Sequence, residues 1–169
     1  MQTNNNNNTT VLAIDPSITC TGYAVLTDSG DRLVAGGLIK PKRTDERMDK
    51  IRYICECVDR LVLDYTPDVA IIELTSGKVN RGRHTGGGAG LAVYGMCVGA
   101  VWKLLSNYDT HQTFGVYEND WTKGKGGKVK RKIICSLVYP NQYDPDKDSG
   151  GDLADAILIG RWFFDSAML

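Results

Sequence analysis

Several features that define common protein classes are missing from this sequence. No apolar stretch is long and uninterrupted enough for a transmembrane helix, and the start, MQTNNNNNTT, lacks the basic region and apolar run of a secretory signal. The five cysteines are odd in number and lie mostly in apolar runs, and Cys55-x-Cys57 has no second pair at the spacing of a zinc site. We therefore expect a cytoplasmic protein with reduced thiols and no membrane association.

The chain also lacks an excess of either charge and a nucleotide-binding motif. Its formal net charge is zero, which taken alone argues against coating of nucleic acid by charge. The pattern G-x-x-x-x-G-K-[ST] is absent, so we predict no nucleotide cofactor. The charges are nevertheless uneven, because residues 78–132 hold ten Lys and Arg against three Asp and Glu. A neutral chain with such a basic segment can carry a face that binds a polyanion.

The pattern of apolar residues predicts an α/β fold. Three short apolar runs joined by turns predict an antiparallel meander, and two later apolar runs alternate with helical patterns. We expect strands at 11–14, 22–27, 33–39, 69–74 and 113–118, and helices at 44–65, 91–105, 133–139 and 152–169.

These elements predict a five-stranded mixed sheet, three antiparallel strands and then two parallel ones, flanked by helices. Thr44 is the expected N-cap of the first helix. The helix at 91–105 is apolar on nearly every side, and Gly95 and Gly99 would let a partner approach closely, so it belongs to the core or to an interface. We expect one domain over 11–169, preceded by a disordered Asn-rich tail at 1–10.

Four acidic residues stand out because of where they lie. Asp15 and Glu73 are at the ends of apolar strands, where burying a lone carboxylate is expensive. Asp152 and Asp155 are three residues apart at the start of the last helix, on one face of its first turn. If the first and fourth strands are neighbours and this helix crosses their ends, the four acids converge and repel one another unless cations are bound. Such oxygen ligands suit Mg²⁺ or Mn²⁺, and two ions about 4 Å apart form a clamp for phosphodiester hydrolysis.

Each acid also has a simpler interpretation. Asp152 and Asp155 could serve only as first-turn acids favoured by the helix dipole. Asp15 could accept hydrogen bonds from the turn that follows it, and Glu73 could pair with an arginine or a lysine. All of these must hold at once for the cluster to be accidental, so we favour a metal site.

Five motifs follow one another in a specific order: AIDPSITCTGYAVL, DVAIIE, a Gly-rich loop with an apolar helix, WTKGKGGKVKRK and GDLADAILIG. In this order and spacing the chain, from Val11 to Trp162, resembles the RuvC family of Holliday junction resolvases, within the RNase H-like superfamily. The resemblance implies an RNase H-like fold and a metal-dependent endonuclease. It also implies a homodimer that nicks two strands of a four-way DNA junction symmetrically. The compact chain and the Asn-rich start would fit a phage-borne relative, acting in a bacterial cell or in an infected host.

The resemblance also implies roles for individual residues. Asp15 is the carboxylate that bridges two Mg²⁺ or Mn²⁺ ions, Glu73 is the second strand acid, and Asp152 and Asp155 are the helix pair that completes the sites. A catalytic lysine is expected among Lys123, Lys128 and Lys130, with Lys130 as the first choice. The residues expected to contact DNA phosphates are Lys78, Arg81, Arg83, Lys123, Lys125, Lys128, Lys130 and Arg131.

One departure from the family leaves the substrate open. Bacterial members carry an aromatic residue after the Glu that wedges into the junction, but this chain has no Phe or Tyr between Glu73 and Arg83. The alternatives are an RNase H-like nuclease acting on flaps, forks or RNA–DNA hybrids, and a non-catalytic DNA-binding module. The sugar-kinase and actin-like ATPases share only the first hairpin and need two domains, for which 169 residues are too few. For Trp121 we favour core packing over stacking on an unpaired base.

Overall fold

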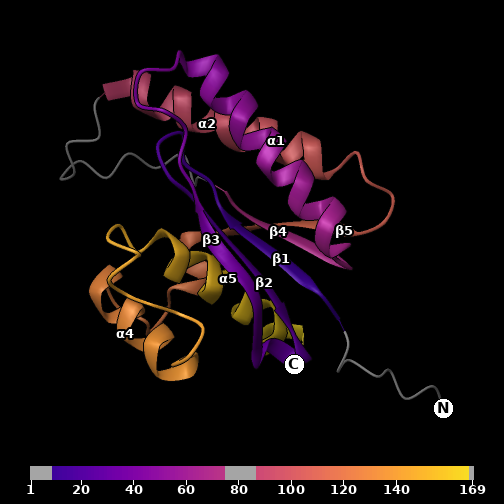
Figure 1. Cartoon of the computed structure of the whole chain (residues 1–169), viewed down its shortest axis with the longest axis vertical. Helices are drawn as coiled ribbons and strands as arrows, with labels where there is room; N and C mark the ends of the chain where they lie inside the picture. The colour runs from indigo at the N-terminus through magenta and orange to yellow at the C-terminus, as the bar shows by residue number, and fades with distance from the viewer. Residues whose placement is uncertain (1–8, 75–86, 168–169) are drawn as a thin grey trace.

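The structure is a computed structural model that describes residues 9–74 and 87–167, and in these ranges five strands form one mixed sheet (Figure 1). The strands are β1 (Val11–Asp15), β2 (Thr21–Thr27), β3 (Arg32–Ile39), β4 (Val69–Leu74) and β5 (Gln112–Tyr117). Their order is β3-β2-β1-β4-β5. β1, β2 and β3 pair antiparallel, whereas β4 is parallel to β1 and β5 is parallel to β4. The predicted sheet of three antiparallel and two parallel strands is confirmed.

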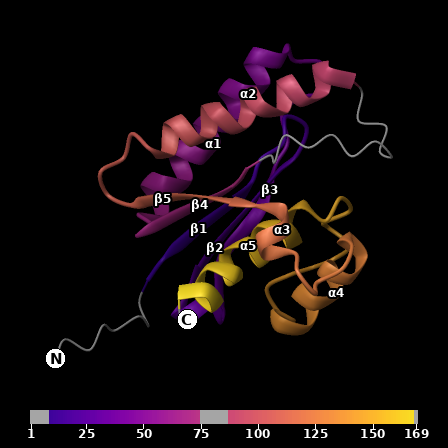
Figure 2. The ribbon, with the colours of Figure 1, turned by 180° about the vertical axis from the view of Figure 1, so that it is seen from behind.

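Helices cover both faces of this sheet, as the two opposite views show (Figures 1 and 2). α1 (Arg47–Tyr65) and α2 (Gly87–Leu105) lie together on one face. α4 (Lys128–Val138) and α5 (Asp152–Ala167) lie on the other face, and the short α3 (Glu118–Trp121) follows β5. A 3₁₀ turn (Asp28–Gly30) connects β2 to β3. None of the described helices combines the length and the apolar character needed to cross a bilayer.

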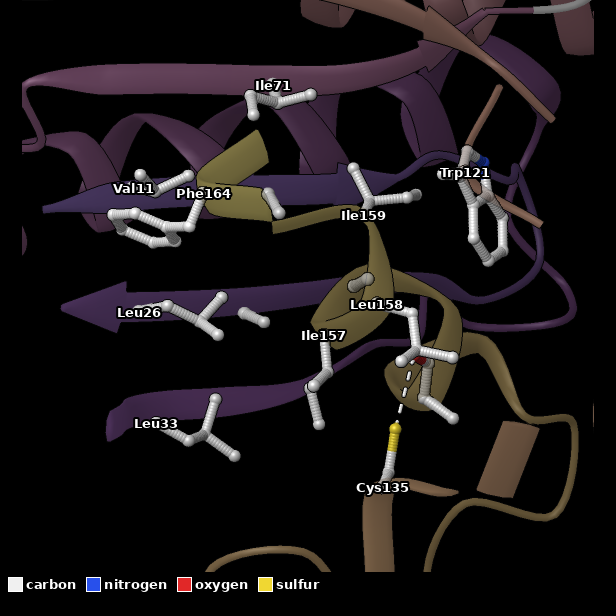
Figure 3. Packing of buried hydrophobic residues seen from close by; sticks show 14 of the residues in the cluster. Val11, Leu26, Leu33, Ile71, Trp121, Cys135, Ile157, Leu158, Ile159 and Phe164 are labelled. Atoms are coloured by element: carbon white, nitrogen blue, oxygen red, sulfur yellow. Dashed lines mark hydrogen bonds between the residues drawn. The ribbon is translucent and has the colours of Figure 1, made fainter. Parts of the chain in front are cut away.

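The central strands are buried on both faces, and their side chains alternate between two cores. Those directed at α1 and α2 include Leu12, Ile14, Val25, Ala70 and Ile72. Those directed at α5 include Val11, Ala13, Leu26, Val69 and Ile71, which pack against Ile157, Leu158 and Ile159 (Figure 3). Because side chains alternate with a period of two, Asp15 follows Ala13 onto the α5 face, and Glu73 follows Ile71. The carboxylates of both strands are therefore directed toward the helix that carries the other two acids.

The ends of several elements differ from the prediction. α1 begins at Arg47 with Glu46 as N-cap, because Lys42 to Asp45 form a turn closed by the Asp45 N–H to the Lys42 carbonyl at 3.1 Å. Thr44 is therefore in a turn and is not the N-cap. Thr10, the last residue of the predicted tail, donates its N–H to the Asp68 carboxylate at 2.8 Å, and its carbonyl accepts from the N–H of Val69, the first residue of β4, at 3.2 Å. Residues 1–8 lie outside the described part of the chain.

β2 and α5 come into backbone contact beside Asp15. Gly22 pairs with Asp15 in the antiparallel register. A methyl group placed on Gly22 would overlap the carbonyl group of Asp152 and would lie 3.1 Å from the Leu153 nitrogen. Only glycine allows this approach, which brings the first turn of α5 next to the end of β1.

The first turn of α5 is held by a buried carboxylate five residues before its Leu153. Asp148 is fully buried and accepts hydrogen bonds from the N–H groups of Leu153 at 3.2 Å and Ala154 at 2.9 Å. The buried Tyr143 donates its hydroxyl to the same carboxylate at 2.8 Å. The N–H groups at a helix start have no partner within the helix, so this carboxylate satisfies two of them.

We expect Gly22→Ala to destabilise the protein, because its methyl group can be placed only if α5 moves away from β2. The cost of such overpacking is about 1–3 kcal/mol, which corresponds to a fall of several degrees in the midpoint of thermal unfolding followed by circular dichroism. Gly90→Ala is the control, since nothing lies within 4 Å of a methyl group at that position in α2. A Gly22→Ala variant as stable as the parent would contradict the close packing.

We expect Asp148→Ala to cost about 2 kcal/mol or more in unfolding free energy, because two helix N–H groups and the Tyr143 hydroxyl lose their buried partner. Tyr143→Phe is the milder comparison, since it removes one hydrogen bond and leaves the helix N–H groups satisfied, at a cost of about 1 kcal/mol. Urea unfolding of both variants measures the difference. Equal losses for the two would show that the contacts with α5 contribute little.

Candidate active site

The four acidic residues singled out in the sequence come from three elements that meet at one end of the sheet. Asp15 is the last residue of β1, and Glu73 is near the end of β4. β1 and β4 are parallel, with Ile14 opposite Ile72, so the two acids stand one residue further along neighbouring strands. Asp152 and Asp155 occupy the first turn of α5. Asp155 is buried, with 4% of its surface exposed, and the other three are half-buried.

The two strand acids lie close enough to influence each other. Burial raises the pKa of Asp15 well above its usual value, and the negative charges of Glu73 and Asp155 raise it further. Burial also raises the pKa of Glu73, although hydrogen bonds with Asp15 and Trp121 offset part of that effect. Two carboxyl groups in such surroundings resist ionising together unless positive charge is supplied. A positive charge close to the pair would therefore favour the ionised forms of both carboxyl groups.

Lys128, at the start of α4, contributes positive charge to both helix acids. Its Nζ lies 2.6 Å from Asp152 Oδ1 and 3.6 Å from Asp155 Oδ2. Burial alone would lower the pKa of Lys128, but the hydrogen bond to Asp152 and the charges of Asp152, Asp155 and Asp15 raise it. Lys128 is therefore the member of the predicted lysine set that contacts the acids.

Arg131, one turn after Lys128, is buried with 6% of its surface exposed. Its Nε lies 2.6 Å from Asp155 Oδ1, and its second guanidinium nitrogen donates to Asp155 Oδ2 at 3.0 Å. Its third nitrogen donates to the Gly126 carbonyl at 3.2 Å. The prediction that Arg131 contacts DNA phosphate does not fit this placement, because its guanidinium faces the interior of the protein.

Trp121, at the end of α3, has 1% of its surface exposed and belongs to the same core cluster as α5 (Figure 3). Its indole N–H donates to Glu73 Oε1 at 3.1 Å. The preference for core packing fits this position, but sequence reasoning missed the hydrogen bond to the acid. A signal was present, since a buried tryptophan usually needs an acceptor for its N–H.

The remaining predicted basic residues lie away from the acids or outside the described residues. Lys123 and Lys130 are exposed, and the aliphatic chain of Lys130 lies against Gly126. Lys125 donates to the Trp121 carbonyl at 2.6 Å. Lys78, Arg81 and Arg83 lie in the segment 75–86, outside the described residues. In the described structure Lys130, our first choice as catalytic lysine, is not in contact with the four acids.

The chemistry of the donor set fits a divalent cation that prefers oxygen. Carboxylates are the ligands that Mg²⁺ and Mn²⁺ favour, and four of them are available here. Within residues 9–74 and 87–167, no three acidic, histidine or cysteine side chains approach one another closely enough to hold one ion together. Lys128 and Arg131 instead neutralise the two helix acids, so Asp152 would exchange Lys128 for an ion on binding it.

Comparisons with known proteins agree with this arrangement. A sequence model of the family "Crossover junction endodeoxyribonuclease RuvC" matches residues 11–82. The crossover junction endodeoxyribonuclease RuvC of Rickettsia prowazekii (strain Madrid E) is 32% identical over 152 residues, which cover 88% of this chain and 92% of that protein. The match to the protein of the same name from Rickettsia bellii (strain OSU 85-389) is 34% identical over 101 residues and spans 60% of that relative's length.

Solved structures share the fold. The chain superimposes on T. thermophilus RuvC in complex with Holliday junction substrate with a TM-score of 0.73 and 18% identity, covering 95% of this chain and 96% of the other. The yeast mitochondrial Holliday junction resolvase Ydc2 gives a TM-score of 0.56 at 14% identity. These likenesses bear on the fold, which is the RNase H-like arrangement that the sequence predicted. The identity of 32% to the Rickettsia prowazekii protein, over most of both chains, shows that this chain belongs to the RuvC family of crossover junction endodeoxyribonucleases.

Proposed function

We propose that this protein resolves four-way DNA junctions by paired, symmetric nicks, using divalent metal ions bound by Asp15, Glu73, Asp152 and Asp155. The observation that carries the proposal is that β1, β4 and the first turn of α5 meet at one end of the sheet, where the charges of Glu73 and Asp155 raise the pKa of the buried Asp15. Membership of the RuvC family adds to it, since relatives bear the name crossover junction endodeoxyribonuclease and one is described in complex with a Holliday junction substrate. The reaction would belong to DNA recombination and repair.

The four acids would share the work of holding two Mg²⁺ or Mn²⁺ ions. Such ions activate the attacking water and stabilise the leaving oxygen in phosphodiester hydrolysis. The pKa of Asp15 is raised by burial and by the charges of Glu73 and Asp155 and lowered by that of Lys128, so Asp15 is within electrostatic reach of all three. Of the two acids that contact Lys128, Asp152 is the more accessible, with 19% of its side chain exposed against 5% for Asp155.

Lys128 is the residue that we propose as the basic member of the site. Its side chain is about half exposed, at 48%, and reaches Asp152 and Asp155 while remaining open to solvent. A lysine in that position would contact the scissile phosphate once the acids hold cations. Lys123 and Lys130 remain candidates for binding the flanking phosphates, together with the basic residues at 78, 81 and 83.

We also propose a homodimer, with α2 as the interface. One face of α2, made of Cys97, Val98, Val101 and Leu105, is buried in the core. The opposite face exposes Leu91 at 37% and Met96 at 49%, and nothing lies within 4 Å of a methyl group placed on Gly95 or Gly99. An apolar helix face with open glycines allows a second helix to approach closely. Two copies of the site would then act on two strands.

We expect the protein to cut a synthetic four-way junction in the presence of Mg²⁺ or Mn²⁺, giving paired nicks on opposite strands. Asp15→Asn should lower the rate at least ~100-fold, or by about 2.7 kcal/mol of transition-state stabilisation, because it removes the shared ligand. Junction binding should be retained, since a negative charge near DNA has been removed. Cleavage products on a denaturing gel and binding in a gel-shift assay measure the two effects.

Asp64→Asn is the matched control for that experiment, because Asp64 is an exposed acid on α1, away from the site. A flap, a fork, a plain duplex and an RNA–DNA hybrid are tested beside the junction. Faster cutting of the flap, fork or hybrid would overturn the proposed substrate. Junction binding with no cleavage under any metal condition would favour a non-catalytic DNA-binding module.

The dimer is tested by light scattering at micromolar concentration without DNA, where a single chain has a mass of 18.5 kDa. We expect twice that mass for the parent and a shift toward the monomer for Met96→Glu, because the new charges would be buried against each other. Met48→Glu is the control, since Met48 is an equally exposed methionine, at 57%, on α1. A monomeric parent, or an unchanged mass for Met96→Glu, would contradict the proposed interface.

A further inference from the structure

A buried arginine and a buried tryptophan connect two of the acids through the protein interior. Trp121 donates to Glu73 on β4 at 3.1 Å, and Arg131 pairs with Asp155 on α5 at 2.6 and 3.0 Å. The guanidinium of Arg131 lies over the Trp121 ring, 5.1 Å from its centroid. The contacts therefore run without interruption from Glu73 to Trp121, Arg131 and Asp155, linking two acids on different elements.

The burial of this pair excludes two simpler roles. Arg131 has 6% and Trp121 has 1% of its surface exposed, so neither can contact a DNA phosphate or stack on a base without a large rearrangement. Burying a guanidinium is costly, and a core that needed only filling would be served better by an apolar side chain. The ion pair with the buried Asp155 carboxylate offsets the desolvation cost of the Arg131 guanidinium.

The geometry suits the orientation of a ligand. A guanidinium presents its donors in a fixed plane, so the hydrogen bond to Asp155 Oδ2, together with the ion-pair contact of Nε at 2.6 Å from Oδ1, restricts the rotation of that carboxylate. A carboxylate has about four lone-pair positions, so both oxygens keep the capacity to bind a cation. The indole N–H fixes one oxygen of Glu73 in the same way and leaves the other oxygen available.

We infer that Arg131 and Trp121 act as a positioning pair for the metal ligands Asp155 and Glu73, and that Arg131 is not a DNA contact. The inference rests on the proposed function for the identity of the site. Arg131 and Trp121 both lie within the basic segment at 78–132, and the inference gives them a role different from that of the neighbouring lysines. Outer contacts of this kind usually change metal affinity or activity by about 10- to 100-fold when they are removed.

Direct Mn²⁺ binding without DNA, followed by calorimetry, is the main measurement. We expect Arg131→Gln and Trp121→Phe each to weaken Mn²⁺ binding by about 10-fold or more. Trp121→Phe keeps an aromatic ring in the core, smaller than the indole, and removes the N–H donor to Glu73. Because either change breaks the connection, the loss in the double variant should be smaller than the product of the two single losses. Independent, multiplicative losses would overturn the idea that the two residues act as a pair.

Arg131→Lys keeps the positive charge but loses the two-point contact, and it guards against failure of Arg131→Gln to fold. If charge alone were needed, Arg131→Lys would bind Mn²⁺ like the parent, and the positioning role would be wrong. Lys132→Gln is the matched control, since it removes one positive charge from α4 and Lys132 makes no ion pair with the acids. Parent-like Mn²⁺ affinity is expected for that control.

Junction binding in the absence of divalent cations separates positioning from phosphate contact. We expect Arg131→Gln and Trp121→Phe to leave junction affinity and its salt dependence within about 2-fold of the parent. If Arg131 contacted a phosphate, loss of its charge in Arg131→Gln would weaken binding and reduce the salt slope by about 1. Weaker junction binding with unchanged Mn²⁺ affinity would overturn the inference.

Failure of the proposed function gives a different pattern of results. If the protein binds Mn²⁺ in a manner that depends on Arg131 and Trp121 but does not cut junctions, the positioning pair stands and the substrate is wrong. If the parent cuts junctions and the variants retain parent Mn²⁺ affinity, the function stands and the positioning pair is wrong. Junction cleavage therefore tests the proposed function, and Mn²⁺ affinity tests the positioning pair, independently of each other.

Discussion

The burial of the Asp15 carboxylate is the constraint on which the surrounding structure depends. Burial raises the pKa of this carboxylate at the end of a central strand. Its negative charge needs a nearby positive charge, or the carboxyl group must share a proton with another acid. Strand alternation directs Asp15 and Glu73 to the same face of the sheet, and the absence of a side chain at Gly22 lets α5 approach that face. The core packing of β1, β4 and α5 is thus also what assembles the site.

The positive charge that this group requires comes from one helix. α4 supplies Lys128 to Asp152 and Asp155, and it supplies Arg131 to Asp155 alone. The two cations differ in exposure, because the side chain of Lys128 is 48% exposed and that of Arg131 is 7% exposed. A half-exposed lysine can exchange partners when a metal ion or a phosphate arrives, whereas a buried arginine held at two points cannot do so without disrupting the core. The helix α4 therefore carries one positive charge that can change partners, Lys128, and one that stays with Asp155, Arg131.

Sequence patterns were sufficient for the sheet because alternation and turn residues are local signals. They also located the four acids, since a charge within an apolar run is visible without a structure. Arg131 could not be separated from its lysine neighbours, because its burial depends on how α4 docks against α5. The start of α1 was misplaced for a similar reason, as a turn at 42–45 competes with the Thr44 cap. Contacts between elements that are distant in the sequence could not be predicted from the sequence alone.

The helix α4 consequently cannot be treated as one electrostatic surface. Its charges divide by depth, and depth follows from the helical period: Arg131, Cys135 and Tyr139 recur every fourth residue and are buried, while Lys130 lies on the exposed side. Exposed charges attract DNA in proportion to their number and are weakened by salt, whereas a buried charge acts on its single partner and is screened far less. Salt should therefore weaken the attraction between DNA and exposed lysines such as Lys130 far more than it weakens the buried ion pair between Arg131 and Asp155.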